Sequence, residues 1–464
     1  MGKVRTRFAP SPTGYMHIGN LRTALYAYLI AKKDGGDFNL RIEDTDQGRL
    51  VEGATDVIYS TLKDCGLNWD EGPDIGGDYG PYVQSERMDN YLKYAKMLVE
   101  NGSAYYCFCT EEELDARIPK KEECGEMIRR YDGHCRNLSK EEVEAKLAAG
   151  TPYVIRQKMP SEGVTTFHDL VYGDVSVENK ELEDQILIKS DGMPTYNFAN
   201  VVDDHLMGIT HVVRGNEYLS SSPKYNLLYE AFGWDTPEYV HCAPVMKDEH
   251  QKLSKRNGDA SYQDLVAKGY LTEAVLNYIA LLGWSPKGER ELFTVEELIK
   301  EFDLSGISKS PAIFDPEKLK YINSEYIRAL THDEFKGHAM PFIRQAVKRD
   351  DVDFDILCDV LQPRTEYFSD IPEKLSFIDK RPDIDPQLYF SKKFKTDSAT
   401  AKPALEASLE VLKGLDDFSV ESVHSALLSL VESLGVKNGW ILGPLRVAIS
   451  GVQEIGRASC RVRV

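Results

Sequence analysis

The stretch RFAPSPTG at residues 7–14, followed by HIGN at residues 17–20, decides the fold of this chain. Residues 3–9 alternate in a way that is typical of a β-strand. Two prolines then interrupt the strand, and from Gly19 onward apolar residues recur at helical spacing. The sequence therefore predicts a strand, a tight loop and a helix that starts at His17 and Gly19. Ligands of open α/β sheets bind at the carboxyl ends of strands, so this loop is a candidate binding site.

A second motif, KLSKRNG at residues 252–258, lies far downstream. A helix N-terminus binds phosphate, and lysines on a loop neutralise a leaving phosphate group. When a carboxylate attacks the α-phosphate of ATP, negative charge builds on the departing pyrophosphate. Together the two motifs predict cleavage of ATP between its α- and β-phosphates. For the HIG triplet taken alone, a strand-to-helix connection with a surface histidine is the alternative.

The composition is that of a soluble, multidomain protein. With 464 residues, the chain is too long for a single core, and two to four domains are expected. A net charge of −19 argues against a general nucleic-acid binder, although residues 1–39 are locally basic. Eight unevenly spaced cysteines indicate a reducing compartment, and the sequence has neither a signal-peptide pattern nor an apolar run of membrane-spanning length. We therefore expect a cytoplasmic location.

Changes in pattern along the chain predict its organisation. Strands and helices alternate at first, an insertion with a cysteine cluster follows, and the α/β pattern then returns. The last third is acidic and helical, and its end is basic without helical periodicity. For that end we expect a truncated gene followed by translated adapter sequence, and a natural basic tail is the alternative. The predicted segments are 1–95, 96–192, 193–245, 246–330, 331–451 and 452–464.

Further motifs carry a family resemblance. They are LRIEDTD at 40–46, GPY at 80–82, QSER at 84–87, PTY at 194–196 and NVVDDH at 200–205. With the first two motifs, they make the chain resemble class I aminoacyl-tRNA synthetases, and among them the bacterial-type glutamyl-tRNA synthetases, as far as about Gly451. The resemblance implies an α/β fold, with a Rossmann-like doubly wound parallel sheet as the catalytic domain. It also implies an inserted acceptor-end-binding domain, a stem-contact region, and an all-helical anticodon-binding region at the C-terminal end.

The resemblance further implies an activity. Members make glutamyl-adenylate from L-glutamate and ATP, with Mg²⁺ accompanying ATP, and then transfer glutamate to the terminal adenosine of tRNA-Glu. They are usually monomeric, and neither DNA nor a membrane is implied as a partner. The alternatives are a glutaminyl enzyme, an enzyme that glutamylates a modified tRNA base, a small-molecule adenylyltransferase and a non-catalytic tRNA-binding paralogue. The helical last third argues against the first three of these alternatives.

Binding of glutamate requires a cation for its side-chain carboxylate, ideally an arginine that can bind it with two hydrogen bonds. Arg7 and Arg214 are near predicted strand ends that a doubly wound sheet would bring together, and a surface ion pair is the alternative for each. A neutral glutamine would leave a buried guanidinium uncompensated, at a cost of about 3–5 kcal/mol. By the resemblance, the amino-acid site comprises Arg7, Ser11, Glu43, Tyr196, Asn200 and Arg214.

For ATP, the resemblance assigns catalysis to His17, Gly19, Lys252 and Lys255. Lys255 is expected to meet the α-phosphate and the pyrophosphate. No catalytic base is required, because the glutamate α-carboxylate is already ionised at neutral pH. Asn20 replaces a histidine of many family members, and a solvated loop acid is the alternative for Glu217. The predicted ATP-binding residues are Ala9, His17, Gly19, Asn20, Glu217, Lys252, Leu253, Ser254 and Lys255.

The cysteine cluster has two interpretations. Zinc takes four ligands in a closed tetrahedron, and some related enzymes combine Cys-x-Cys with Tyr-x-x-x-Cys. Asn137 stands where zinc-bearing glutamyl enzymes have a histidine, and His134 and Cys124 are other candidate ligands. Three free thiols are the alternative. The ligands that the resemblance implies are Cys107, Cys109, Tyr131 and Cys135.

One residue of the helical region is a candidate for reading the anticodon. Arg364, in the sequence Gln362-Pro363-Arg364, matches the neighbourhood of a family arginine that contacts anticodon bases. Single-stranded loop bases are read by hydrogen bonds and stacking, which suits an arginine. A surface arginine at a helix end is the alternative.

Overall fold

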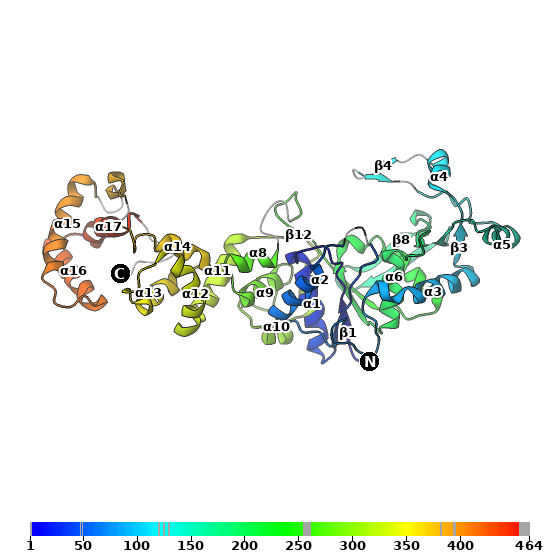
Figure 1. Ribbon diagram of the computed structural model, residues 1–464, viewed down its shortest axis with the longest axis horizontal. Coiled ribbons are helices and arrows are strands. Elements are labelled where there is room, and N and C mark those ends of the chain that lie inside the picture. Colours follow the sequence, from blue (N-terminus) through cyan, green and yellow to red (C-terminus); the bar gives the residue numbers. More distant parts are fainter. Residues whose placement is uncertain are drawn as a thin grey trace. The chain divides into compact units, whose positions relative to one another are not determined.

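A computed structural model describes residues 2–46, 48, 50–118, 121–123, 126–128, 130–253, 261–380, 383–392 and 396–453. The chain divides into two compact units (Figure 1). The first unit comprises Met1–Ala267 and Thr272–Pro316, and the second comprises Lys268–Leu271 and Glu317–Val464. Each unit has a hydrophobic core of its own.

The main sheet of the first unit has six strands: β1 (Arg5–Phe8), β2 (Asp37–Leu40), β7 (Val164–Asp169), β8 (Gly173–Glu178), β10 (His211–Gly215) and β11 (Glu238–Cys242). Their order is β2-β1-β10-β11-β7-β8. All neighbours are parallel except β7 and β8, which are antiparallel. The carboxyl ends of β1, β2, β10 and β11 therefore meet at one edge, where ligands of open α/β sheets bind.

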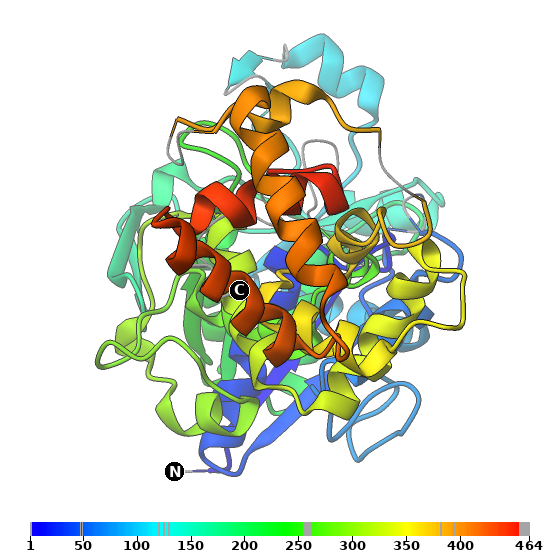
Figure 2. The ribbon, with the colours of Figure 1, turned by 90° about the vertical axis from the view of Figure 1, so that its left-hand side faces the viewer.

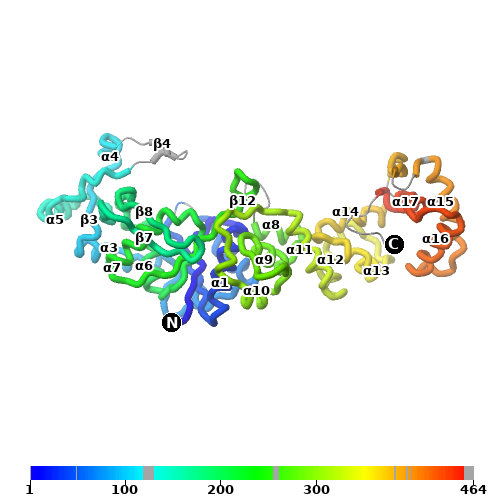
Figure 3. Tube along the Cα trace, turned by 180° about the vertical axis from the view of Figure 1, so that it is seen from behind, coloured from blue at the N-terminus to red at the C-terminus, as the bar shows by residue number. Residues whose placement is uncertain are grey.

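Helix α1 (Ile18–Lys33) follows β1 and packs against β1, β2 and β10. It also contacts α9 (Thr272–Leu281) and α10 (Val295–Glu301), which lie beside it in Figure 3. Its residues from Ala24 to Ala31 are buried except one, as expected of a helix covered on nearly all sides. Packing against the sheet and these helices therefore holds α1 in position.

A smaller antiparallel sheet contains β3 (Ala104–Cys107), β6 (Val154–Gln157) and β9 (Ile186–Ile188). It shares a hydrophobic core with α3 (Met88–Glu100), α6 (Tyr196–Leu206) and α7 (Ser222–Phe232). The cysteine at the end of β3 and the first residues of α6 are therefore carried by one packed body. The remaining elements of the first unit are α2 (Ala54–Asp64), α4 (Glu111–Arg117), β4 (Lys121–Glu123), β5 (Glu126–Ile128), α5 (Lys140–Ala148), β12 (Val245–Met246), α8 (Tyr262–Ala267) and β13 (Ala312–Ile313).

Beyond residue 331, the described part of the second unit consists of helices joined by loops. It contains no strand apart from an isolated bridge between Ser391 and Thr396. Its last three helices contact one another around a core that includes Leu427 and Ile441, and they face the viewer in Figure 2. The helices are α11 (Pro316–Ala329), which begins in the first unit, α12 (His332–Ala346), α13 (Phe354–Leu361), α14 (Ile371–Lys374), α15 (Ser398–Lys413), α16 (Val420–Leu434) and α17 (Asn438–Ser450).

The predicted fold class is confirmed, with a mixed, mostly parallel sheet followed by a helical region. The strand predicted over residues 3–9 is β1, and the helix predicted from Gly19 is α1. Residues 96–192, predicted as an insertion, contribute β7 and β8 to the edge of the main sheet. The six segment boundaries stay predictions, and most of segment 452–464 lies outside the described residues.

None of the described helices combines the length and apolar character that a membrane crossing requires.

Candidate active site and cysteine cluster

Arg7 and Arg214 lie on the neighbouring parallel strands β1 and β10, near their carboxyl ends. Both residues are buried, with exposed fractions of 4% and 5%. Nη1 of Arg7 donates to the backbone oxygen of Val213, next to Arg214, at 3.3 Å. The sheet thus brings together two cations that are far apart in the sequence.

Asp204, on α6, pairs with Arg7. It accepts Arg7 Nε at 2.9 Å and Nη2 at 3.2 Å, and it also accepts Arg41 Nη1 at 2.8 Å. Arg41 donates its Nη2 to Glu43 at 2.9 Å. Burial opposes ionisation of Asp204, but Arg7 and Arg41 together hold its pKa below the usual value. Asp203 extends this group, since it lies 3.9 Å from Arg41 Nε and accepts a hydrogen bond from Arg87 Nε at 2.7 Å. Three buried guanidinium groups and three buried carboxylates therefore form a cluster in which the charges balance.

Glu43 links this cluster to the other residues predicted to bind glutamate. Burial raises the pKa of Glu43, although Arg41 opposes the shift. Tyr196, the first residue of α6, interacts electrostatically with Glu43 and Arg214, and burial raises the pKa of its phenol. Asn200 donates Nδ2 to the backbone oxygen of Tyr196 at 2.7 Å. These side chains therefore lie close together, near the carboxyl ends of β1 and β10.

Arg214 has no ion pair with a carboxylate among the described residues. Its Nε donates to His241 Nε2 and its Nη2 to Ser222 Oγ, both at 3.3 Å. Its Nη1 is buried, and no acceptor for it is found in the described part of the chain. Three tyrosine rings surround the guanidinium carbon at 4.6, 5.3 and 5.4 Å, from Tyr225, Tyr218 and Tyr239. A desolvated cation with an unused donor is suited to receive an anion.

The loop after β1 carries the first motif. His17 is the N-cap of α1, and its Nδ1 accepts the backbone N–H of Gly19 at 3.0 Å. A neutral imidazole whose Nδ1 accepts carries its proton on Nε2, which is then a donor. Gly19 is closely approached, because a Cβ there would lie 3.2 Å from His17 Nδ1. Ala9 and Ser11 precede this turn, and Asn20 is exposed in the first turn of α1.

The second motif begins on a short hairpin. Lys252 forms a β-bridge with β12, and the buried Leu253 donates its backbone N–H to Val245 at 3.1 Å. The chain is described again from Ser261, which forms a β-bridge with His17. Val245 in turn is close to Gly19, because its Cγ2 would lie 3.9 Å from a Cβ there. Leu253 and Ser261 are therefore both anchored near the first motif. The predicted residues outside the described part are Ser254 and Lys255.

Glu217 lies directly after β10. It is an exposed residue of a single 3-10 turn, Asn216–Tyr218. Its carboxylate packs over Gly215, where an added Cβ would lie 2.2 Å from Glu217 Oε2. Glu217 is therefore near the strand end that carries Arg214, and no contact ties it to the α1 loop in the described residues.

Sequence reasoning missed four buried partners in this region: Arg41, Asp169, Asp204 and His241. Arg41 and Asp204 belong to the quoted motifs LRIEDTD and NVVDDH, but a motif without coordinates does not say which charges pair. His241 lies in the buried part of β11, and a polar residue in a buried strand segment is the signal that could have identified it.

The three thiols of the cysteine cluster converge, with Cys107, Cys109 and Cys135 Sγ atoms all within 4.8 Å of one another. Tyr131 Oη lies 3.3 Å from Cys107 Sγ and 3.7 Å from Cys109 Sγ. Hydrogen bonds from Cys135 and Tyr131 lower the pKa of the Cys107 thiol to about 4. His134 is exposed and outside this group.

The donor set fits zinc. Tetrahedral Zn–S bonds of about 2.3 Å place two sulfurs about 3.8 Å apart, and Cys109 and Cys135 Sγ are separated by 3.5 Å. The Tyr131 oxygen supplies a fourth donor. Two arginines flank the group and would offset its negative charge: Arg117 donates to Cys109 Sγ at 3.3 Å, and Arg156 lies 4.0 Å above the Tyr131 ring. Cys124 lies outside the described residues.

A cavity of about 450 Å³ separates the cysteine cluster from α6. Tyr131 and Arg156 contribute to one side, and Thr195 and Asn197 at the start of α6 contribute to another. Glu183 also lines it and accepts the backbone N–H of Tyr131 at 2.7 Å. Tyr131 of the cluster and the first turn of α6 therefore line the same cavity.

Arg364 lies in the second unit, in a 3-10 turn at Gln362–Arg364. It is half-buried, and its Nη1 donates to the backbone oxygen of Val360 at 2.6 Å. Lys374 in turn donates to the backbone oxygen of Arg364 at 2.5 Å. These contacts fix the turn, and the surface-arginine alternative for this residue stays open.

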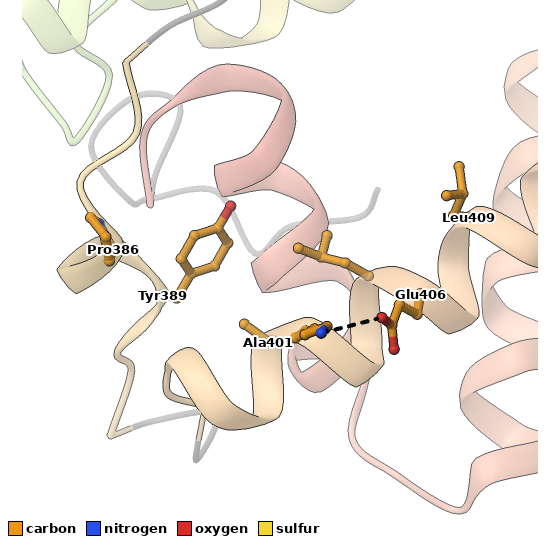
Figure 4. A pocket seen from close by; sticks show the side chains of 7 residues that line it. Pro386, Tyr389, Ala401, Glu406 and Leu409 are labelled. Carbon is orange, nitrogen blue, oxygen red and sulfur yellow. Dashed lines mark ion pairs between the residues drawn. The ribbon is translucent and has the colours of Figure 1, made fainter.

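A second cavity, of about 340 Å³, lies in the second unit beside α15. Tyr389 faces Ala401 across it, and Glu406 forms an ion pair with Lys402 at 3.9 Å (Figure 4). Apart from that exposed pair and the Tyr389 hydroxyl, its lining is apolar, so it suggests no chemistry. The lining residues are Pro386, Tyr389, Ala401, Lys402, Leu405, Glu406 and Leu409.

Comparisons with known proteins agree with this architecture. Residues 3–321 match the family "tRNA synthetases class I (E and Q), catalytic domain", and residues 331–454 match the "Anticodon binding domain" family. The glutamate–tRNA ligase of Clostridium botulinum is 61% identical over 97% of this chain and 93% of its own length. That of Clostridium acetobutylicum is 59% identical, with 97% and 92% covered.

A solved structure has the same fold. The glutamate tRNA ligase of Elizabethkingia meningosepticum, crystallised in complex with its amino acid, gives a TM-score of 0.83 at 37% identity. The match covers 98% of this chain and 94% of that chain.

Proposed function

Since the chain belongs to the glutamate–tRNA ligases of the class I tRNA synthetases, we propose that it attaches L-glutamate to tRNA-Glu with ATP as the energy source. In the first step, an oxygen of the glutamate α-carboxylate bonds to the α-phosphorus of ATP, and pyrophosphate leaves. In the second step, a ribose hydroxyl of the tRNA's terminal adenosine bonds to the glutamyl carbonyl carbon, loses its proton, and AMP leaves. No external oxidant or reductant is required.

The observation that carries this proposal is the state of Arg214. It is a buried cation with an unused donor, beside a cluster whose own charges balance. A carboxylate ligand supplies the missing anion, and a neutral amide does not. We assign the glutamate side chain to Arg214 and the glutamate ammonium to Glu43. Tyr196, Asn200, Ser11 and Arg7 complete the predicted amino-acid site.

For ATP, the proposal uses the helix end and the two lysines. The N-terminus of α1 offers backbone N–H groups, and the Nε2–H of His17 offers a side-chain donor. Lys252 and Lys255 neutralise the charge that develops on pyrophosphate. Mg²⁺ accompanies the nucleotide as part of the substrate. The other predicted nucleotide contacts are Ala9, Gly19, Asn20, Glu217, Leu253 and Ser254.

Two parts of the chain serve the tRNA in this proposal. The cysteine group would hold one zinc ion through Cys107, Cys109, Cys135 and Tyr131, and the ion would brace the region next to the cavity. The second unit would read the anticodon, with Arg364 as a candidate base contact. An adenylyltransferase acting on a small molecule would leave that unit without a role. A cytoplasmic location stays a prediction from cysteine usage.

The test is ATP-dependent charging of separate tRNA-Glu and tRNA-Gln transcripts with radiolabelled glutamate. Wild type is compared with Lys255→Ala, and Lys180→Ala, a surface lysine paired with Glu178, is the matched control. We expect tRNA-Glu to be charged, and the rate to fall about a hundredfold or more only in Lys255→Ala. Failure of wild type to charge tRNA-Glu would contradict the proposal. The tRNA-Gln reaction reports how selective the enzyme is.

A further inference from the structure

The contacts behind Arg214 are unusual for a buried arginine, because they are all neutral or aromatic in the described part of the chain. Its Nε reaches His241 Nε2, and its Nη2 reaches Ser222 Oγ. The Ser222 hydroxyl uses its own proton on the backbone oxygen of Tyr218 at 2.9 Å, so its oxygen is available to accept. By contrast, Arg7 on the next strand is held by a carboxylate through two hydrogen bonds.

The contact with His241 requires one particular form of the imidazole. An arginine carries only donors, so His241 Nε2 must accept and cannot hold a proton. The proton of the neutral ring is therefore on Nδ1. That atom lies 2.6 Å from Asp169 Oδ2, which is a hydrogen-bond acceptor. His241 is fully buried, and burial lowers its pKa, which agrees with a neutral ring.

Asp169 is itself fixed. It is fully buried at the end of β7, and its two oxygens accept four N–H groups. These are Nδ1–H of His241 and the backbone N–H groups of His241, Val171 and Tyr172, at 2.6, 3.1, 2.9 and 2.7 Å. Although burial opposes ionisation, the His241 and backbone hydrogen bonds keep the pKa of Asp169 below its usual value. An anionic, acceptor-only carboxylate imposes the Nδ1–H tautomer on His241.

We propose that Asp169 and His241 are positioning residues that hold Arg214 as an un-neutralised cation, and thereby set the enzyme's preference for a carboxylate over an amide side chain. This inference rests on the proposed function. His241 fixes the guanidinium by accepting from Nε without contributing a charge of its own. Asp169 fixes His241 from the far side of the ring, where its charge does not pair with the guanidinium directly. The Nη1 donor of Arg214 stays available for the substrate.

A carboxylate in the place of His241 would neutralise Arg214. A direct Asp or Glu on Arg214 Nε would form the kind of ion pair that Asp204 forms with Arg7. The guanidinium would then already be paired with a carboxylate in the absence of substrate. The ion pair has no net charge, so it would no longer attract the side-chain carboxylate of glutamate. A neutral acceptor supported by a remote carboxylate provides alignment without that compensation.

The test measures KM for L-glutamate and KM for ATP separately in the full-length enzyme with tRNA-Glu. His241→Leu removes the acceptor, and His241→Gln restores one, because the Gln side-chain oxygen reaches the place of Nε2. Asp169→Asn removes the charge that selects the tautomer. The matched controls are His168→Gln and Asp174→Asn. These two residues form an exposed pair on the β7–β8 hairpin, which also carries Asp169, and His168 Nδ1 lies 2.7 Å from Asp174 Oδ1.

We expect His241→Leu and Asp169→Asn to raise KM for L-glutamate about tenfold to a hundredfold, since a buried donor loses its partner or its alignment. KM for ATP should stay within about twofold, and His241→Gln should recover most of the glutamate affinity. The ratio of kcat/KM for glutamate over glutamine should fall in the two impaired variants and not in the controls.

An unchanged KM for glutamate in folded Asp169→Asn would overturn the proposal, as would parallel rises in both KM values. His241→Gln that is as impaired as His241→Leu would overturn the role of the acceptor. If His241→Leu does not fold, Asp169→Asn and His241→Gln decide the outcome, with circular dichroism as the check on folding. A wild type that does not charge tRNA-Glu overturns the proposed function as well, so the two failures are distinguishable.

Discussion

Arg7 and Arg214 lie on adjacent parallel strands, but in the described part of the chain only Arg7 is paired with a carboxylate. Two cations that look equivalent in the sequence therefore have different roles. Arg7 belongs to a buried cluster of three arginines and three carboxylates whose charges balance, so it mainly holds the site together. Arg214 carries the uncompensated charge that an acidic substrate can satisfy.

The first prediction concerns the balanced cluster. Asp204→Asn should lower the free energy of unfolding of the first unit by about 3–5 kcal/mol, because it leaves Arg7 and Arg41 buried with one carboxylate fewer. Urea unfolding followed by circular dichroism measures the change. Asp174→Asn, whose side chain is 75% exposed, is the control and should change little. Equal stability of Asp204→Asn and wild type would show that the cluster does not stabilise the first unit.

The second prediction separates the two roles of His17. His17→Ala removes both the cap of α1 and the proposed donor to phosphate, so stability should fall by about 1 kcal/mol and kcat by about a hundredfold. His17→Asn keeps a capping side chain, so it should restore stability and leave kcat low. Thermal unfolding and single-turnover charging measure the two effects. Recovery of kcat in His17→Asn would mean that the cap alone is what catalysis needs.

The third prediction is a pH dependence of stability. Burial lowers the pKa of His241, so below about pH 6.5 the unfolded chain binds a proton that the folded chain does not. This residue therefore makes stability fall as pH drops below that value. His241→Gln should show a shallower loss between about pH 6.5 and 5, measured by urea unfolding.

His168 provides a control of opposite sign for that experiment. The hydrogen bond to Asp174 raises the pKa of His168, so its contribution is present at low pH and is lost as pH rises through the folded-state pKa. His168→Gln should therefore steepen the loss of stability at low pH or leave it unchanged, because the pair is exposed. The same slope in His241→Gln and wild type would contradict a buried neutral ring.

The fourth prediction concerns the cysteine cluster. Protein purified without chelators should contain about one zinc per chain by atomic emission, and Cys107→Ser should lower that content, since a thiolate ligand is lost. Cys65→Ser, a buried cysteine outside the cluster, is the matched control. Wild-type protein that carries no metal would favour the interpretation of three free thiols.

The sequence predicted the elements that local patterns determine. The strand before the first proline and the helix after Gly19 follow from alternation and helical spacing alone, as does the helical character beyond residue 331. The Arg41–Asp204 contact does not follow from local patterns, because the two residues are 163 positions apart and the sheet order decides which parts of the chain meet. Likewise, nothing local to Arg214 indicates that its neighbours are neutral, since His241 and Ser222 come from other elements.

The resemblance supplied the site residues, and the geometry distinguishes among them. Both arginines were predicted to receive the substrate carboxylate, because the sequence could not show that Asp204 reaches Arg7. Lys255, which the resemblance places at the phosphates, lies outside the described residues. Its role therefore stays a prediction that kinetics must test.

Recognition of the substrate by Arg214 is measured by the KM for L-glutamate of Arg214→Gln in tRNA-Glu charging. Arg5→Gln is the control, because Arg5 begins β1, the strand next to that of Arg214, and is already paired with Asp37 and Glu71. We expect KM for glutamate to rise about a hundredfold or more in Arg214→Gln, while KM for ATP stays within about twofold. An unchanged KM for glutamate would show that Arg214 is not the cation that recognises the substrate.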